Sequence, residues 1–136
     1  MPVADTSNEI LKGCIAALKA DGTLSGLVGQ RIYVDVPQKA QFPYIKLGLE
    51  TQPFATQSFS GCEHLIKVQI FSRDSSSYEA SRIRAACWNV MDRNEGAITL
   101  DSGTLVMMQY SGLGTLFQED DGRTWQALAE FRALVQ

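Results

Sequence analysis

Two stretches of this chain, residues 44–50 and 62–71, alternate apolar and polar residues with the two-residue period of a β-strand that is covered on one face only. The residues on the apolar faces are Ile45, Leu47 and Leu49 in the first stretch and Ile66, Val68 and Ile70 in the second. Because a sheet built from such strands must bury its apolar face, we expect another layer of secondary structure to pack against it.

Two segments with the period of an α-helix can supply this layer. The first follows a capping box from Thr6 to Glu9, ends at Asp21-Gly22, and is continued by a short helical turn that Gly29 closes. Its apolar stripe is Leu11, Cys14, Ile15 and Leu18, with Gly13 off the stripe. The second follows a capping box from Ser76 to Glu79 and ends near Asn94. Its stripe is Ala80, Ile83, Cys87, Val90 and Met91.

The other segments read as strands and turns. Further strands are expected at Ile32–Val36, Ala97–Leu100, Leu105 to about Phe117, and Trp125–Leu134. Gly112 and Gly114 predict a bulge or register break within the long strand, and Asp120-Asp121-Gly122 predicts a hairpin turn. The sequence therefore predicts one α+β domain over residues 1–136. We expect an antiparallel or mixed sheet with two helices packed on one face.

Composition excludes several classes of protein. The chain has 136 residues and a formal net charge of -3, which argues against a nonspecific nucleic-acid binder. It has no apolar run near the roughly 20 residues that span a bilayer, and no secretory signal is expected. Three cysteines without a CxxC pair indicate free, partly buried thiols in a reducing compartment.

The residues that could carry chemistry do not form a catalytic or metal-binding set. Cys62 and His64 would share one side of a strand, but zinc needs three or four ligands. A Cys-His nucleophile needs an orienting third group, and Glu63 would point away. We therefore expect His64 to be a polar residue at a strand edge that makes a hydrogen bond. Glu119, Asp120 and Asp121 fit a solvated turn better than acid-base chemistry. No cofactor, metal or enzymatic activity is expected.

Several aromatic residues lie in loops or at strand ends. Phe54, Phe59, Tyr78 and Trp125 suit a protein interface, although singly exposed aromatic residues also occur by chance. Trp88, on the second helix, suits either core packing or an interface anchor. Phe54 and Phe59 belong to Thr51–Gly61, a segment rich in Ser, Thr and Gln that we expect to be a long loop between two strands.

The segment from Arg31 to Gly48, R-I-Y-V-D-V-P-Q-K-A-Q-F-P-Y-I-K-L-G, resembles the hallmark segment of a phage tail-completion family. This family includes tail terminators of siphophages and of gene transfer agents. The resemblance runs from Leu11 to Ala133. Its further blocks are Glu63-His64, Ser72-Arg73, Glu79-Ala80, Gly122-Arg123-Thr124-Trp125 and Phe131-Arg132-Ala133. Ser75-Ser76-Ser77 departs from the pattern, because many members have a glycine in this turn.

The resemblance implies a structural role in virion assembly. It implies a ring, commonly a hexamer, that caps the head-proximal end of the finished tail tube, stops its polymerisation and joins the tail to neck and head-completion proteins. Such a ring would be assembled in the bacterial cytoplasm, and DNA would pass through it without specific binding. The interface residues that we expect are Tyr33, Pro37, Gln38, Phe42, Pro43, Tyr44, Phe54, Phe59, Arg73, Tyr78 and Trp125.

Two hypotheses concern particular segments. Pro37 and Pro43 restrict their own backbone and that of the preceding residue, so this crossing could be a stiff connector at a subunit boundary. Alternatively, it merely packs over the core through Phe42. We also expect Thr51–Gly61 to protrude and to meet a neighbouring subunit or the tail tube; otherwise it is a mobile solvent loop.

Other functions remain open at this point. A head-closure or other neck protein is the nearest alternative. From another class, a small α+β ligand-binding protein or enzyme with an intersubunit site would need a pocket that holds His64 beside Glu63 or Arg73. A plain oligomerisation module of a bacterial complex is the third.

Overall fold

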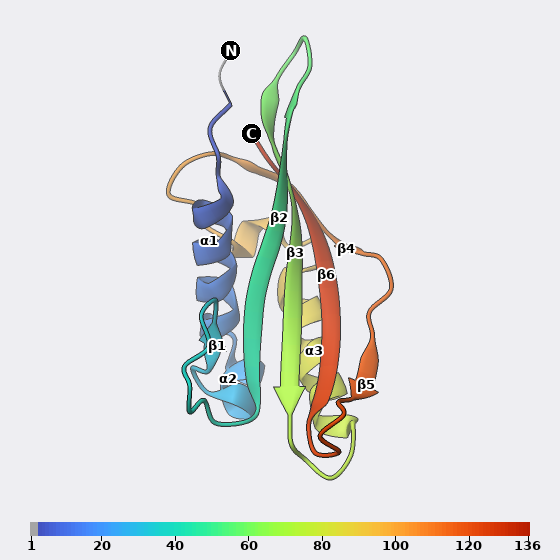
Figure 1. Cartoon of the computed structure of the whole chain (residues 1–136). Coiled ribbons are helices and arrows are strands. Elements are labelled where there is room, and N and C mark those ends of the chain that lie inside the picture. The colour runs from blue at the N-terminus through green and yellow to red at the C-terminus, as the bar shows by residue number, and fades with distance from the viewer. Residues whose placement is uncertain (1–2) are drawn as a thin grey trace.

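The computed structural model describes residues 3–136, which form a six-stranded sheet with helices against one face (Figure 1). The long strands are β2 (Tyr44–Ala55), β3 (Ser60–Ser72) and β6 (Trp125–Val135). The short strands are β1 (Ile32–Tyr33), β4 (Leu105–Ser111) and β5 (Leu116–Gln118). The strand order is β1-β2-β3-β6-β4, and β5 also pairs with β6. The sheet is mixed, because β1 runs parallel to β2 while the other described pairs are antiparallel.

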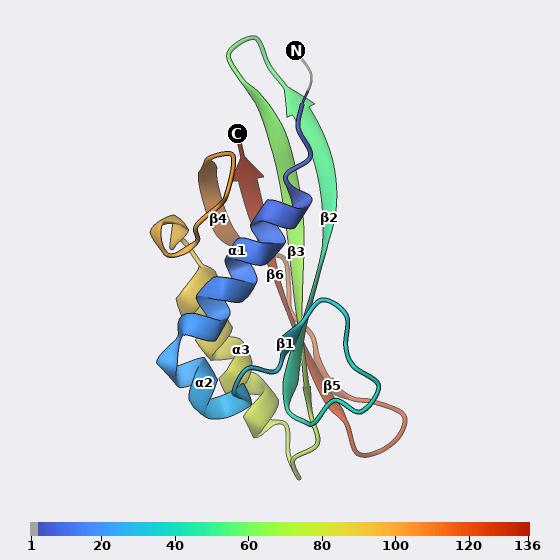
Figure 2. The ribbon, with the colours of Figure 1, turned by 90° about the vertical axis from the view of Figure 1, so that its left-hand side faces the viewer.

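Three α-helices of the described chain form the covering layer. They are α1 (Ser7–Ala20), α2 (Gly22–Val28) and α3 (Tyr78–Met91), and a 3-10 turn, η1 (Glu95–Ala97), follows α3. Figure 2 shows α1, α2 and α3 on the same side of the sheet, which leaves its other face without helices. The predicted α+β class is therefore confirmed. The short helical turn expected after Asp21 is α2, which adds a third helix to the two main ones expected.

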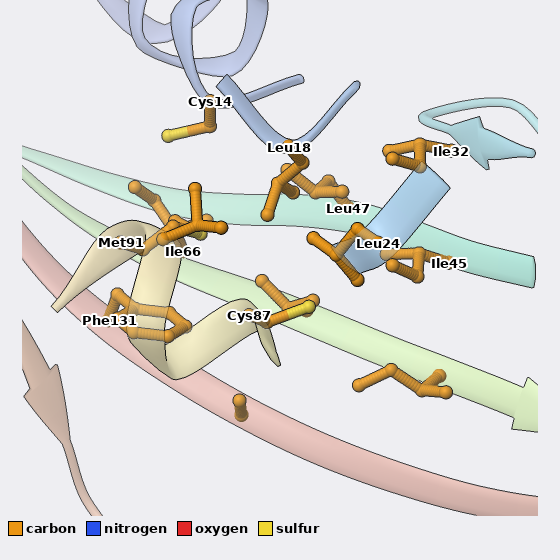
Figure 3. Close-up of a cluster of buried hydrophobic side chains, with 14 of the residues drawn as sticks. Cys14, Leu18, Leu24, Ile32, Ile45, Leu47, Ile66, Cys87, Met91 and Phe131 are labelled. Carbon is orange, nitrogen blue, oxygen red and sulfur yellow. The ribbon is translucent and has the colours of Figure 1, made fainter. Parts of the chain in front are cut away.

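The core lies between the helices and the sheet (Figure 3). Both alternating strand patterns are confirmed in their apolar residues, of which only Leu49 is not fully buried. From β6, Phe131 is completely buried and is the largest such side chain. Burial of a side chain of this size stabilises the folded state by roughly 1.5–3 kcal/mol. The predicted stripe of α3 is also buried throughout, from Ala80 to Met91.

The predicted stripe of α1 is only half right. Cys14 and Leu18 are buried, but Ile10 is fully buried where the sequence pattern favoured Leu11 and Ile15, which pack at the margin of the core. Gly13 was expected off the stripe and instead lies on the buried face. A Cβ atom at Gly13 would come within 2.7 Å of the backbone oxygen of Thr99. The helix is therefore rotated so that its glycine contacts the backbone of residues 98–100.

Both predicted capping boxes are wrong. Thr6 precedes α1 but makes no side-chain cap, because its hydroxyl is hydrogen-bonded to His64. Glu9 has a buried carboxylate oxygen without a hydrogen-bond partner in the described chain. At α3 the Glu79 carboxylate accepts a hydrogen bond from the Ser72 hydroxyl at 2.7 Å instead of reaching back to Ser76. In both places a tertiary partner replaces the local one.

Two predicted strands differ from the structure. The strand expected over Ile32–Val36 ends at Tyr33, and Val34 is already exposed, so β1 is only an edge contact with the start of β2. The strand expected over Ala97–Leu100 is not formed. This segment follows η1 and places Ile98 in the core against α1, so that its backbone contacts a helix instead of a strand.

The loop expected over Thr51–Gly61 is largely a β-hairpin. β2 and β3 stay paired as far as Ala55 and Ser60, and only Thr56–Phe59 form the turn. The pattern was obscured because side chains on both faces of this hairpin are mostly exposed, which removes the alternation that identifies a strand. The hairpin extends past the rest of the sheet in Figure 1, as the predicted protrusion requires.

The predicted interruption of the long strand after Leu105 is confirmed. β4 ends at Ser111 and β5 begins at Leu116, and both pair with β6. Gly112 has a φ of 73°, a conformation that glycine adopts without steric cost. Gly114 lies so close to the backbone of Leu128 that no side chain would fit. The Asp120-Asp121-Gly122 turn between β5 and β6 is also confirmed.

The position of Gly13 gives a first prediction. Gly13→Ala should destabilise the protein although alanine favours helix formation by about 1 kcal/mol, because its Cβ would collide with the Thr99 backbone. Gly26→Ala is the matched control: this glycine also lies in a helix, and a Cβ there has nothing within 4 Å. Chemical denaturation should show a lower free energy of unfolding for Gly13→Ala and a higher one for Gly26→Ala than for the wild type. A gain at both positions would contradict the close contact.

Candidate interaction surfaces

One end of the molecule collects most of the residues that the sequence analysis assigned to an interface. The guanidinium of Arg73 lies 4.1 Å from the centre of the Phe42 ring, a cation–π geometry. Its Nε donates to Thr124 Oγ1 at 3.1 Å. The ring centre of Tyr44 lies 5.1 Å from that of Phe42 and 6.1 Å from that of Tyr33. The crossing between β1 and β2 is therefore held against the start of β2 and the end of β3.

This cluster forms one wall of a groove of about 440 Å³. Its lining residues are Val36, Pro37, Gln38, Lys39, Ala40, Phe42, Tyr44 and Arg73. Behind it, Arg31 Nε donates to the carbonyl oxygen of Pro43 at 2.8 Å, and the Phe42–Pro43 peptide bond is cis. Seven of the eleven predicted interface residues thus belong to one continuous feature, five of them as lining residues.

Two further predicted residues, Tyr78 and Trp125, differ in exposure. Tyr78, the first residue of α3, is 65% exposed, with Arg82 5.5 Å from its ring centre. Trp125 is half-buried against the core, and its Nε1 has no hydrogen-bond partner among the described residues. Only Tyr78 offers a large free surface. Trp88 is likewise packed on the core, edge to face with Tyr110 at 5.4 Å.

The last two predicted residues, Phe54 and Phe59, lie at the opposite end, in the projecting hairpin. Their rings pack edge to face with centres 5.4 Å apart. Thr56 closes the turn, because its Oγ1 accepts hydrogen bonds from the backbone N–H groups of Ser58 and Phe59. Beyond Cys62 the two strands of the hairpin pair only with each other. The predicted interface residues therefore fall into two separate groups.

His64 contradicts the expectation of a polar residue at a strand edge. Its side chain is fully buried on the central strand, β3. Nε2 lies 2.8 Å from Thr6 Oγ1, and Nδ1 lies 2.9 Å from Thr51 Oγ1. Thr51 Oγ1 in turn lies 2.8 Å from Ser7 Oγ. His64 thus joins the segment before α1 to the base of the projecting hairpin.

The direction of these hydrogen bonds fixes the tautomer of His64. Ser7 has one hydroxyl proton, which it donates to Asp5 Oδ1. Thr51 must therefore donate to Ser7, and Thr51 Oγ1 accepts from His64 Nδ1–H. Nε2 is then the unprotonated nitrogen and accepts from Thr6. Every hydroxyl and ring nitrogen of this network has a partner, so the network is structural.

The ionisable groups around His64 do not form a reactive site. Burial lowers the pKa of His64, and the Asp5 carboxylate partly opposes this effect. Glu63 points to the open face of the sheet, where Arg132 holds it through two hydrogen bonds, of 2.8 and 3.2 Å. Within residues 3–136 no three His, Cys, Asp or Glu side chains gather as a metal site would require. No helix in this range is long and apolar enough to cross a membrane.

The thiols and the acidic turn have structural roles as well. Cys14, Cys62 and Cys87 are free and buried, and burial raises the pKa of Cys14 and Cys87 to about 12. At the β5–β6 turn, Asp121 accepts hydrogen bonds from the Thr124 hydroxyl and from two backbone N–H groups. These bonds, that of the Thr124 hydroxyl first, lower the pKa of Asp121 to about 2.

The outer edge of β4 is covered by residues that sequence patterns did not single out. Asp92 Oδ1 accepts from the backbone N–H of Tyr110 at 2.7 Å, and Glu95 Oε1 accepts from that of Met108 at 2.9 Å. The N–H of Arg93 donates to the carbonyl oxygen of Met108 at 2.7 Å. The segment after α3 therefore occupies the hydrogen-bonding groups that an added strand would use. A side-chain to backbone contact of this kind has no signature in the sequence.

These features define a small α+β protein. The polar side chains around His64 and in the acidic turn are engaged in internal hydrogen bonds, and the features left for interaction are the groove and the projecting hairpin. A family model described as tail completion protein gp17 matches residues 13–136. The chain therefore belongs to the tail completion protein gp17 family.

A solved structure and the curated proteins give two further comparisons. The chain is similar to one in the structure described as "Virion of native gene transfer agent (GTA) particle", with a TM-score of 0.86 and 20% sequence identity over 96% of both chains. At 20% sequence identity, this similarity shows that the two chains share a fold. No curated protein sequence matches the chain.

Family membership confirms the resemblance seen in the sequence. The protein is a structural tail-completion protein of a virion, and it is not an enzyme. The alternative of an enzyme with a site around His64 is thereby set aside. The buried position of His64, with Glu63 on the opposite face of the sheet, agrees with this.

The His64 network predicts a pH dependence. The folded state binds a proton at His64 at lower pH than the unfolded state, whose histidine has a pKa near 6.5, so stability falls as the pH drops below that value. We expect the free energy of unfolding to decrease as the pH is lowered from about 6.5, because the unfolded chain then takes up a proton that the folded protein resists. His64 is the only histidine, so urea unfolding of His64→Gln at the same pH values is the control. If the free energy of unfolding of His64→Gln depends on pH as steeply as that of the wild type, His64 is not the cause of the pH dependence.

Proposed function

We propose that the protein is a tail terminator. Copies of the chain form a ring, with six subunits the expected number, that caps the head-proximal end of the tail tube and stops its polymerisation. The same ring offers a surface to the neck and head-completion proteins, and DNA passes through it without specific binding. Membership of a tail-completion family supports this role.

The observation that carries the proposal is the hairpin between β2 and β3. Residues 51–62 contain no Asp, Glu, Lys or Arg, although Glu50 and Glu63 lie on either side. Phe59, at the turn, is 41% exposed. A two-stranded hairpin is marginally stable in water on its own, and burial of its apolar side chains against another protein would stabilise it. We therefore assign this hairpin to the contact with the tail tube.

The orientation of the hairpin supports this assignment. It extends the long axis of the sheet beyond the other strands (Figure 1). The groove beside Phe42 and Arg73 lies at the other end of β2 and β3. The two candidate surfaces therefore lie at opposite ends of β2 and β3. We assign the end that bears the hairpin to the tube and the end that bears the groove to the neck proteins.

The crossing from Pro37 to Pro43 fits the second assignment. The cation–π contact between Arg73 and Phe42 and the hydrogen bond from Arg31 to Pro43 hold the crossing at both β1 and β3. A segment held in this way presents Pro37 and Gln38 in a fixed position. This agrees with the hypothesis of a stiff connector, although Phe42 also packs over the aromatic side chains as the alternative requires.

Phe54→Ser/Phe59→Ser should abolish capping of the tube without unfolding the protein. The variant removes the two apolar side chains of an exposed hairpin, and we expect its affinity for the tube to fall at least tenfold. The measurement is cosedimentation with the matching tail-tube protein, together with tube lengths measured by electron microscopy. Ser58→Ala, in the same turn, is the matched control and should cap as the wild type does.

The outcomes separate the two parts of this proposal. If the wild-type protein leaves tube length unchanged, the terminator function is wrong and a head-closure or other neck role becomes the better reading. If the wild type caps and the double variant caps equally well, the function stands and the assignment of the hairpin is wrong.

A further inference from the structure

Two opposite sides of the molecule carry exposed apolar side chains. In Figure 1, α1 lies along one side of the sheet, and β4 and β5 lie along the other. Figure 2 looks onto the α1 side, with β4 and β5 faded behind it, so the two views agree. Both sides run parallel to the long axis of the molecule and lie between the hairpin end and the groove end.

The α1 side has an apolar groove of about 540 Å³. Leu11, Ile15, Ala16 and Val34 line it, and these are largely the residues that the sequence pattern placed in the core. The remaining lining residues are Asn8, Lys12 and Lys19, so the groove has two ammonium groups and no carboxylate. The Lys12 ammonium lies 2.6 Å from Asp101, an exposed pair of little energetic weight.

The β4–β5 side presents four of the exposed large apolar residues: Val106, Leu113, Leu116 and Phe117. Leu113 is 93% exposed although the loop around it is fixed. Arg84 of α3 donates from Nη1 to the carbonyl oxygen of Thr115 at 2.8 Å, and Gly114 lies against the backbone of Leu128. An anchored loop thus holds a leucine in water, which is the arrangement expected of an interface anchor.

The charges of the two sides are complementary. The turn that follows β5, Glu119–Arg123, carries three carboxylates and one guanidinium. Of these carboxylates, Asp121 is already engaged by Thr124, whereas Asp120 is exposed. The groove on α1 has Lys12 and Lys19 beside its apolar lining, and of these Lys12 already pairs with Asp101. The lining of the α1 groove thus carries positive charge and the turn after β5 carries net negative charge, which favours contact between them.

We propose that the β4–β5 side of one copy docks on the α1 groove of the next copy. This rests on the proposed function and names the contact by which the ring would close. Because the two surfaces are different and lie on opposite sides, the contact is heterologous. Repetition of such a contact forms a ring when the rotation between copies closes, as the proposed function requires. The hydrogen bonds at Met108 and Tyr110 disfavour strand addition along β4, so we expect side chains to make the contact there.

Two single substitutions test the two surfaces separately. Leu113→Asp changes the anchor, and Ala16→Glu places a carboxylate in the groove; both positions are exposed, so both variants should fold. We expect each variant to assemble at least tenfold more weakly than the wild type. Asn89→Glu, at an exposed position of α3 outside both surfaces, is the control and should assemble normally.

Mixing the two variants gives the decisive result. The Ala16→Glu chain keeps an intact β4–β5 side, and the Leu113→Asp chain keeps an intact groove, so the mixture can form one good contact but cannot repeat it. Native mass spectrometry, at a concentration where the wild type is fully assembled, should detect a 1:1 heterodimer and no ring. Rings in the mixture, or no heterodimer, would overturn this pairing.

The wild-type protein separates the pairing from the proposed function. If it forms no ring, alone or with the tail-tube protein, the proposed function and this contact both fail. If it forms a ring and Leu113→Asp or Ala16→Glu forms the same ring with equal affinity, only the pairing of these two surfaces is wrong.

Discussion

The pairing of β3 with β2 on one side and β6 on the other is the constraint on which the structure depends. β3 is the longest strand, with 13 residues, and its alternate side chains enter the core. A shift of its register by one residue would move Ile66, Val68 and Ile70 to the open face and Glu63 and Lys67 into the core. The positions of the helices, the hairpin and the His64 network all follow from this register.

The parts of the fold that the sequence predicts are those in which burial follows one regular period. Strands around Ile45 and Ile66 and the α3 stripe are of this kind, and Gly112 marks a break that its backbone angle explains. The errors lie where tertiary contacts override local preference. Thr6 would cap a helix in isolation, but it serves His64, which is distant in sequence. Gly13 weakens a helix locally, yet it permits the contact with residues 98–100.

The candidate surfaces were only partly predictable for the same reason. The cluster around Phe42 and Arg73 was found because its residues lie within a distinctive segment, and the structure brings them together. The groove on α1 could not be foreseen, because a half-exposed Ile15 and a buried one give the same periodic pattern. No sequence pattern predicts the exposure of Leu113, because this exposure results from the anchoring of its loop by Arg84.

The covered edge of β4 has a consequence for how such a subunit can assemble. An open strand edge accepts any strand of suitable length, and nothing in its geometry limits how many copies add in succession. Here Asp92 and Glu95, from the same chain, accept hydrogen bonds from two backbone N–H groups at the edge of β4. In the proposed ring, contacts on that side would therefore use side-chain surfaces, and the angle between successive copies would set the number of subunits. A subunit that is proposed to stop the growth of a tube thus also has a covered strand edge, which disfavours unlimited addition of its own copies.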